Sequence, residues 1–237
     1  DTRNDQWAST LPPLPVPGGR VGGALVDLDG RFNLNTLVRV NGPDPVARAR
    51  FERLLAALKL DVGLVDAVID WIDADSQVSP QGAEDLDYLR ADPPYRAANR
   101  PIVHVSELLR IKGIDREAYK LLAPEVCALP PETGMNINTL SVAGIMSLAD
   151  GISQDLAKRL WRGGRAQYRS VTEVVDELTR AGVVLDPAAI QDFKVSSLYF
   201  LARSDVELVD RQYRFYSLLQ RNAGGGRVLQ RAQTAFE

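Results

Sequence analysis

The chain has 237 residues, of which 45% are hydrophobic and 25% charged, and its formal net charge is −3. This is ordinary globular composition, sufficient for one large domain or two to three small ones. The negative net charge provides no overall basic field that would favour nucleic acid. The single cysteine, Cys127, excludes an internal disulfide, and the single histidine, His104, excludes a histidine-based triad or a histidine-rich zinc site.

The first 36 residues are expected to be extended. Residues 11–19 are crowded with proline and glycine, which predicts a stiff connector because proline fixes the backbone and removes a hydrogen-bond donor. Residues 20–28 are typical of a strand, and residues 31–34 of a second short strand after a turn. No run of 18 apolar residues occurs, so no segment is predicted to span a membrane. The abrupt start at Asp1 leads us to expect a further segment upstream.

From residue 44 to about residue 192 the sequence pattern is helical. Asp44-Pro45 has the capping residue and first-turn proline of a helix start, and apolar residues recur after it at helical spacing. A second helix is expected over residues 62–72. The expected N-cap residues of the later helices are Ser106, Asp115, Ser141, Ser153, Ser170 and Asp186.

Near residue 195 the pattern changes to aromatic and β-branched residues. Segments 197–202, 206–210 and 213–221, then a glycine turn and a returning strand over 227–234, predict an antiparallel meander. Strands at both ends therefore flank about 150 helical residues, so we expect an α+β fold with a helical insertion. Its predicted parts are a sheet domain formed by residues 1–36 and 194–237, a first helical module over 37–134, and a second over 135–193.

Two stretches that lie 103 positions apart share the pattern Asn-apolar-Asn-Thr-Leu, at Asn33–Leu37 and Asn136–Leu140. Each lies where an extended segment passes into helical sequence. An Asn side chain at such a place can accept hydrogen bonds from N–H groups that a new helix leaves unpaired. We interpret the pattern as a repeat of two modules entered in the same way. The alternative is chance, because Asn-rich helix starts are common.

Residues 70–85 form the most chemically distinctive segment, an acidic loop. Counted from Asp73 as position one, oxygen-bearing residues fall at positions 3, 5, 7, 9 and 12, the ligand spacing of a calcium loop. Clustered carboxylates also repel one another unless a cation lies among them. Position six is Val78, where such a loop usually needs glycine, so the turn must differ. The predicted Ca²⁺ ligands are Asp70, Asp73, Asp75, Gln77, Ser79, Glu84 and Asp85.

The same loop allows two other interpretations. It could be a solvated acidic segment that closes a helix. A catalytic pair of carboxylates is disfavoured, because no basic or nucleophilic cluster is evident beside it. His104 is expected to be a capping or surface residue, and Cys127 a small buried hydrophobe. We therefore do not expect an enzyme.

Taken in chain order, these motifs resemble the general secretion pathway protein K family, the minor pseudopilin K of bacterial type II secretion. The resemblance extends over nearly the whole chain and rests on the combination of its motifs. They are Leu11-Pro12-Pro13 with Gly18-Gly19, Asp27–Asn35, Asp70–Asp75, Gly82–Asp85, Pro94–Asn99, Ser106–Leu108 and Asn136–Thr139. The resemblance implies a pilin-like antiparallel sheet domain, with a large inserted helical region of SAM-like or helix-hairpin-helix-like modules. It also implies bound calcium, which we assign to the acidic loop alone.

The resemblance further implies a role and a location. It implies a non-enzymatic subunit at the tip of the periplasmic pseudopilus that initiates or caps its assembly. The implied partners are minor pseudopilins I and J, with secreted substrate proteins as further candidates. A single N-terminal hydrophobic helix, upstream of this sequence, would anchor the protein in the inner membrane of a Gram-negative bacterium, with this domain in the periplasm.

A nucleic-acid-binding protein is the competing interpretation. Asn136–Thr139 followed by residues 148–152 resembles a helix-hairpin-helix motif, in which backbone N–H groups and nearby cations meet phosphate. A basic cluster follows, formed by Lys158, Arg159, Arg162, Arg165 and Arg169. The negative net charge and the acidic first module argue against this interpretation, so we expect no nucleic acid partner.

Overall fold

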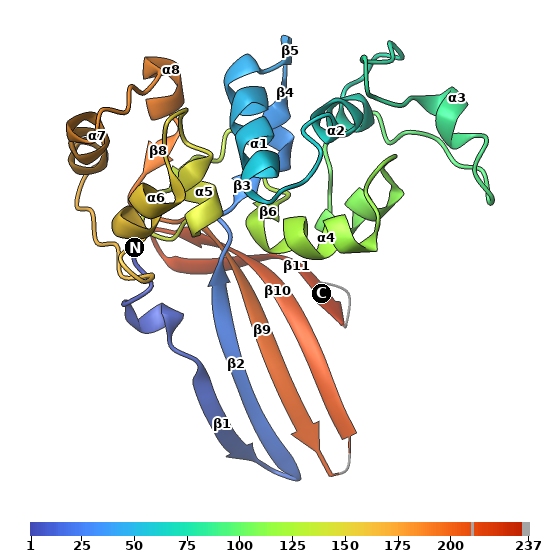
Figure 1. Ribbon diagram of the computed structural model, residues 1–237. Helices are drawn as coiled ribbons and strands as arrows, with labels where there is room; N and C mark the ends of the chain where they lie inside the picture. The colour runs from blue at the N-terminus through green and yellow to red at the C-terminus, as the bar shows by residue number, and fades with distance from the viewer. Residues whose placement is uncertain (210, 234–237) are drawn as a thin grey trace.

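The computed structural model describes residues 1–209 and 211–233, and its base is a five-stranded antiparallel sheet in the order β1-β2-β9-β10-β11. Its strands are β1 (Leu11–Val16), β2 (Gly19–Asp27), β9 (Tyr199–Leu208), β10 (Arg211–Asn222) and β11 (Gly225–Gln233). The two ends of the chain meet where β2 pairs with β9. Strands from both ends therefore lie in one sheet, as predicted, and the helices lie at one end of it (Figure 1).

Two expectations for the N-terminal part are wrong. Residues 11–16 form the edge strand β1 rather than a connector, which is possible because a proline on an edge strand can turn its missing N–H side to solvent. A single-turn 3₁₀ helix, η1 (Gln6–Ala8), precedes it. Phe32 and Asn33 form strand β3, which does not join the sheet but pairs in parallel with β6 (Val126–Cys127). The predicted ends of strands 206–210 and 227–234 reach residues outside the described ranges.

The helical region lies between β2 and β9. Its helices are η2 (Leu34–Leu37), α1 (Pro45–Ala57), α2 (Leu64–Ile72), α3 (Asp85–Tyr88), η3 (Val105–Arg110), α4 (Arg116–Leu122), η4 (Ala123–Glu125), α5 (Val142–Met146), α6 (Gln154–Trp161), α7 (Val171–Arg180) and α8 (Pro187–Ile190). Its short strands besides β3 and β6 are β4 (Val38–Arg39), β5 (Gly42–Pro43), β7 (Met135–Asn136) and β8 (Phe193–Lys194). None of the helices in the described residues has both the length and the apolar content needed to cross a membrane.

Local capping signals predicted most helix starts correctly. Asp44 accepts hydrogen bonds from the N–H groups of the first turn of α1, and five of the later predicted caps act in the same way. The exception is Ser106, because η3 and its N-cap begin two residues earlier than predicted. His104 is its N-cap, and its ring nitrogen accepts from the Ser106 N–H at 3.2 Å. His104 therefore has the capping role expected of it.

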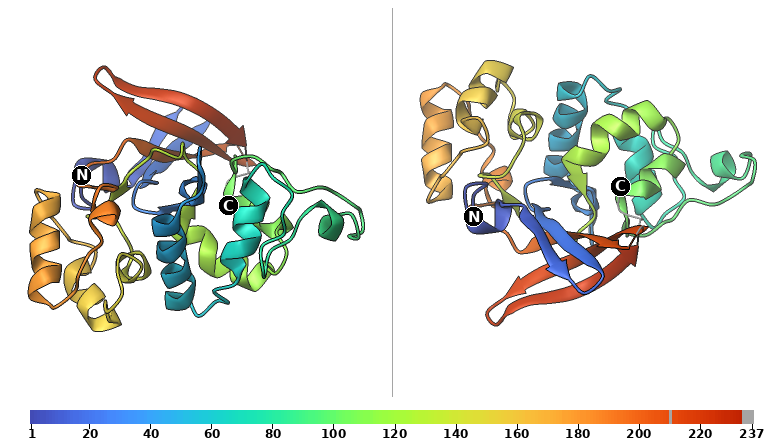
Figure 2. Two further views of the ribbon diagram at one scale, coloured as in Figure 1. Left: turned by 90° about the horizontal axis from the view of Figure 1, so that it is seen from above. Right: turned by 90° about the horizontal axis from the view of Figure 1, so that it is seen from below.

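Two groups of helices lie side by side above the sheet (Figure 2). The first helical group contains α1 to α4, and the second contains α5 to α8. They share one apolar core, in which α1 of the first group packs against α5 of the second. Phe51 of α1 is fully buried and stacks on Phe32, with ring centroids 5.0 Å apart. A smaller apolar cluster, which includes Leu28, Cys127 and Tyr199, joins the helical region to the sheet. Cys127 is thus a small buried hydrophobe, as expected.

Candidate functional site: the acidic loop and the paired asparagine turns

The acidic loop brings together three of the predicted ligands. Asp73 is the C-cap of α2, and Glu84 is the N-cap of α3, so the loop between them closes on itself. One carboxylate oxygen each from Asp73, Asp75 and Glu84 lies within 4.8 Å of the others. Such a group of hard oxygen donors has the chemistry that Ca²⁺ prefers.

Two of these carboxylates, Asp73 and Glu84, are buried, whereas Asp75 is exposed. One oxygen of Asp73 and both oxygens of Glu84 are buried and have no hydrogen-bond partner among the described residues. Burial, followed by repulsion from Asp75 and Asp70, raises the pKa of Asp73 to about 6. Burial and repulsion from Asp73 likewise raise the pKa of Glu84 to about 7. No Lys or Arg among the described residues forms an ion pair with Asp73, Asp75 or Glu84, so their negative charges are not offset within this part of the chain.

Asp70, in the last turn of α2, also contacts the loop. Its carboxylate is fully buried, and burial raises its pKa. One oxygen accepts the Ser79 N–H at 3.0 Å, while the other has no partner among the described residues. A Cβ at Gly82 would lie 1.9 Å from Asp70 Oδ2, so only glycine permits this close approach of the backbone.

Three other predicted ligands have different surroundings. The Gln77 N–H donates to Asp75 Oδ1 at 2.7 Å, and the Ser79 carbonyl accepts the Gly82 N–H at 2.9 Å. Asp85 is turned toward a neighbouring segment. One of its oxygens pairs with the Arg96 guanidinium and the other accepts the Ala97 N–H at 3.0 Å. The structure therefore does not bring the Asp85 carboxylate into the group of three.

Asn99 belongs to this neighbourhood and was not predicted. Its side-chain N–H donates to the Asp75 carbonyl at 3.2 Å, and its Oδ1 is buried with no partner in the described chain. Asn99 adopts a left-handed backbone conformation, with φ of 45°. Spacing within the loop could not indicate a residue this far along the chain. The available signal was the segment Pro94–Asn99, one of the motifs of the family resemblance.

The two Asn-apolar-Asn-Thr turns make equivalent hydrogen bonds. The side-chain amide of Asn35 donates to the Ile102 carbonyl at 2.9 Å and accepts the Ile102 N–H at 2.8 Å. The side-chain amide of Asn138 does the same with Tyr168, at 3.0 and 2.7 Å. Each Asn therefore clamps the backbone of a distant segment in the manner of a strand pair.

The first Asn of each turn, Asn33 or Asn136, also makes an equivalent hydrogen bond within its own turn. Asn33 Oδ1 accepts the Asn35 N–H at 3.2 Å, and Asn136 Oδ1 accepts the Asn138 N–H at 3.1 Å. Each turn also follows a short strand that pairs in parallel with another one, β3 with β6 and β7 with β8. The sequence repeat thus corresponds to a repeat in hydrogen bonding and in local strand pairing.

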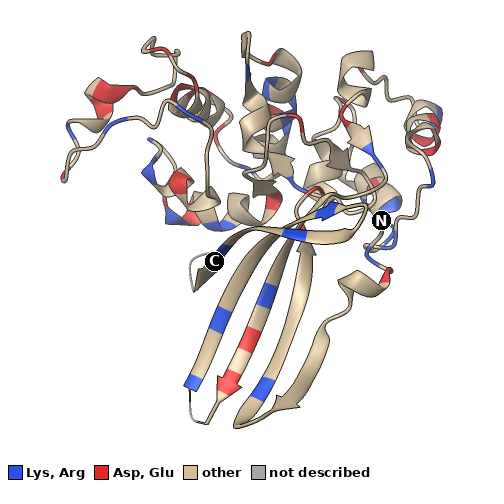
Figure 3. Ribbon diagram, turned by 180° about the vertical axis from the view of Figure 1, so that it is seen from behind, with Lys and Arg blue, Asp and Glu red and all other residues tan. Residues whose placement is uncertain are grey.

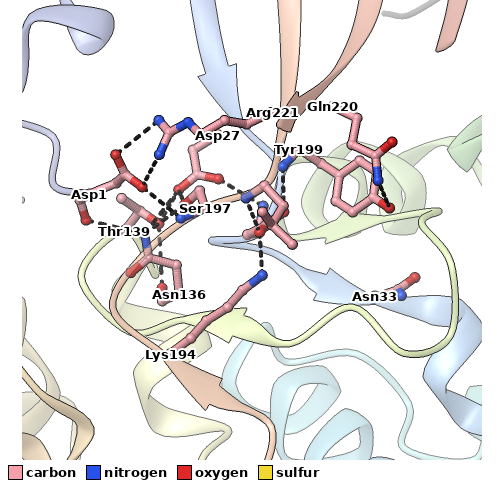
Figure 4. Close-up of polar contacts among 12 residues, drawn as sticks. Asp1, Asp27, Asn33, Asn136, Thr139, Lys194, Ser197, Tyr199, Gln220 and Arg221 are labelled. Atoms are coloured by element: carbon pink, nitrogen blue, oxygen red, sulfur yellow. Dashed lines mark hydrogen bonds and ion pairs between the residues drawn. The ribbon is translucent and has the colours of Figure 1, made fainter. Parts of the chain in front are cut away.

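Figure 4 shows how the second turn is joined to the sheet. Asp27, at the end of β2, accepts hydrogen bonds from the hydroxyls of Thr139 and Ser197, the latter at 2.7 Å. Asp29 is buried, forms an ion pair with Lys194 of β8, and accepts the Leu198 N–H at 2.7 Å. This polar network connects the second helical group, β2 and the start of β9.

The basic cluster offers little support for a nucleic acid interface. Arg162 forms an ion pair with Glu177 of α7 at 3.0 Å and lies over the Tyr168 ring. In the view of Figure 3, acidic and basic residues are mixed over the helical region and do not form one basic face. Arg162 is therefore engaged within the fold, and phosphate binding would require it to be available.

Comparisons with known proteins agree on one family. Residues 30–131 match the family model described as type II secretion system protein K. The type II secretion system protein K of Pseudomonas aeruginosa is 36% identical over 234 residues, covering 95% of this chain and 68% of the relative. That of Aeromonas hydrophila is 32% identical over 252 residues, covering 95% and 74%.

A solved structure is similar over almost the whole chain. It is a chain of the GspK-GspI-GspJ complex of the type 2 secretion system from enterotoxigenic Escherichia coli. The two chains are 27% identical and superpose with a TM-score of 0.85, covering 99% of this chain and 87% of the other.

Proposed function

The chain belongs to the type II secretion system protein K family, and on that premise we propose that it is a non-enzymatic minor pseudopilin at the tip of the periplasmic pseudopilus. The observation that supports this most strongly is the similarity over 99% of the chain to a protein crystallised with GspI and GspJ. We propose the corresponding minor pseudopilins I and J as its partners, and secreted substrate proteins as further ones. The nucleic-acid-binding alternative has no support from these comparisons.

The position at the tip follows from shape. All of the helices after η1 lie at one end of the sheet (Figure 1). A second subunit stacked on that end would collide with this helical region. We therefore expect one copy at the end of each filament, initiating or capping assembly. Imaging of labelled pseudopili that found many copies along the filament would contradict this.

The function can be tested by complementation. A chimera would carry this chain in place of the matching part of the Pseudomonas aeruginosa relative, in a strain that lacks that relative. We expect the chimera to restore type II secretion. A matched chimera without residues 37–193 should not restore it, although it keeps the strands of the sheet. A stable, correctly located full chimera that fails to restore secretion would contradict the proposed role.

We further propose that the helical region consists of two SAM-like or helix-hairpin-helix-like modules, over residues 37–134 and 135–193, inserted into the pilin-like domain of residues 1–36 and 194–237. The equivalent clamps of Asn35 and Asn138 support a repeat. The parallel pairs β3–β6 and β7–β8 support boundaries near those positions.

We also propose that the acidic loop binds Ca²⁺. The donor set fits the ion, because Asp73, the exposed Asp75 and Glu84 converge, and Asp73 and Glu84 keep buried oxygens that lack hydrogen-bond partners in the described chain. Asp70 and Asn99 each keep a further unpaired oxygen beside them. Gln77 and Ser79 remain candidate ligands through oxygens, whereas both Asp85 oxygens have other partners. A bound cation would offset the repulsion and fix the loop; it has no catalytic part.

Equilibrium dialysis followed by elemental analysis tests this directly. Wild-type protein should retain calcium, and Asp73→Asn combined with Asp75→Asn should not. Glu117→Gln removes an exposed carboxylate elsewhere in the chain and should bind as the wild type does. Equal retention by all three proteins would show that the loop is only a solvated helix end.

The membrane location is likewise proposed from the family. We expect the natural protein to have an upstream apolar helix of about 20 residues that crosses the inner membrane once and leaves this domain in the periplasm. A natural reading frame that begins within a few residues of Asp1 would contradict this, as would recovery of the full-length protein from the cytoplasm.

A further inference from the structure

A cavity of about 320 Å³ lies between the first helical group and the sheet. Its wall is formed by the turn after β2, the segment before η3, the α4–β6 region, and strands β9 to β11. Most of the lining side chains are apolar, among them Leu28, Val126, Leu201 and Leu218. Its size falls within the range of small-molecule sites, and its composition is typical of them.

Arg31 lines this apolar wall and also the adjoining hollow that contains Asp27 and Glu125. Its guanidinium makes no hydrogen bond and no ion pair with any residue in the described part of the chain. Asp27 and Glu125 attract it only from beyond ion-pair distance, and burial lowers its pKa. A partly desolvated cation without a bonded partner is costly, and the cost is reduced when an anion binds beside it.

We propose that this cavity binds a linear apolar chain that ends in a carboxylate, a fatty-acid-type monocarboxylate. Its carboxylate would pair with Arg31, and its chain would lie against the apolar wall that includes Leu28, Leu201 and Leu218. The charge of Arg31 selects an anion, and the apolar wall selects a hydrocarbon. A peptide terminus fits less well, because its backbone N–H and C=O groups would be buried against side chains that cannot bond them.

The first test is a ligand series on the wild-type protein, measured by titration calorimetry. Sodium decanoate should bind about tenfold more tightly than 1-decanol, since a charge-assisted hydrogen bond contributes at least about 1.4 kcal/mol. Decyltrimethylammonium should bind more weakly than either. Equal affinities for decanoate and decanol, or the absence of binding by any of them, would overturn the proposal. So would tighter binding of a short apolar peptide with a free carboxylate.

The second test uses variants with matched changes. Arg31→Met should reduce the affinity for decanoate about tenfold, to that of decanol, whereas Arg31→Lys keeps a cation and should retain part of the preference. Lys120→Met removes a cation of the same wall that is exposed and already paired with Glu117, and should change the affinity less than about twofold. Loss of binding in Lys120→Met but not in Arg31→Met would overturn the proposal. The wild-type series decides the matter if Arg31→Met does not fold.

Discussion

Calcium should stabilise the protein strongly at about pH 8 and hardly at all at about pH 5. Without metal, Asp73 and Glu84 have pKa values raised to about 6 and about 7, so both are mostly protonated at the lower pH. Protons then compete with the cation for the same oxygens. A raised carboxyl pKa also means that the metal-free protein loses stability as pH rises through that range, because the folded state binds the proton more tightly than the unfolded state.

The magnitude follows from mass action and from the pKa values. A site with a dissociation constant of about 10⁻⁴–10⁻³ M contributes about 1–2.3 kcal/mol at about 5 mM calcium. A chain of this length gains about 2–4 °C for each kcal/mol, so the melting temperature should rise by about 2–9 °C. Raising the Glu84 pKa from 4.5 to about 7 corresponds to at most about 3–4 kcal/mol, and solvent screening reduces this to about 1–2 kcal/mol.

The assay is thermal unfolding followed by circular dichroism, with calcium or with chelator, at both pH values. The double variant Asp73→Asn/Glu84→Gln should not respond to calcium, and without metal at about pH 8 it should melt above the wild type because it lacks the buried, mutually repelling charges. Glu117→Gln is the control and should respond normally. Asp85→Asn decides whether Asp85 is a ligand, since a retained response would leave it only its contacts with Arg96 and Ala97.

Two results would exclude Asp73 and Glu84 as the calcium ligands. One is an equal effect of calcium at both pH values, because that would mean that Asp73 and Glu84 are not the groups that bind it. The other is an equal effect on the wild type and on the double variant.

Four further substitutions, with one control, test the framework around the site. Asn35→Ala and Asn138→Ala should each lower the free energy of unfolding by about 2–4 kcal/mol in chemical denaturation, because each leaves buried backbone groups unpaired. Asn41 is exposed, so the control Asn41→Ala should change the free energy of unfolding by less than about 0.5 kcal/mol. A difference of more than about 2 kcal/mol between the two clamp variants would argue against their equivalence. Lys194→Met should cost about 3–5 kcal/mol, because the buried Asp29 carboxylate keeps its backbone donors but loses its only paired cation among the described residues. A neutral result would contradict the network of Figure 4. Gly82→Ala should weaken calcium binding, since its Cβ would lie 1.9 Å from a carboxylate oxygen, and unchanged binding would mean that Asp70 does not position the loop.

Short-range signals made much of the fold predictable. A helix start such as Asp44-Pro45 depends on the chemistry of neighbouring residues, so its sequence suffices to locate it. The segment 11–16 could not be assigned in this way. Its prolines describe a stiff extended chain, but its place at the edge of the sheet depends on pairing with β2. Strand β3 likewise depends on β6, which lies more than 90 residues away.

The acidic loop shows the same limit at the level of side chains. Its spacing correctly indicated that Asp73, Asp75 and Glu84 could converge. Spacing could not show that Asp85 is turned toward Arg96, nor that Asn99 returns to the loop, because both depend on the path of the segment that follows.

As the K subunit, this chain should assemble with minor pseudopilins I and J. The most direct measurement is the mass of the mixture of the three periplasmic domains by size-exclusion chromatography with light scattering. We expect a single species with one copy of each, and no regular self-association of this chain when it is alone. Elution of this chain apart from an I–J pair, at concentrations where both components are folded, would contradict its assembly with these two pseudopilins.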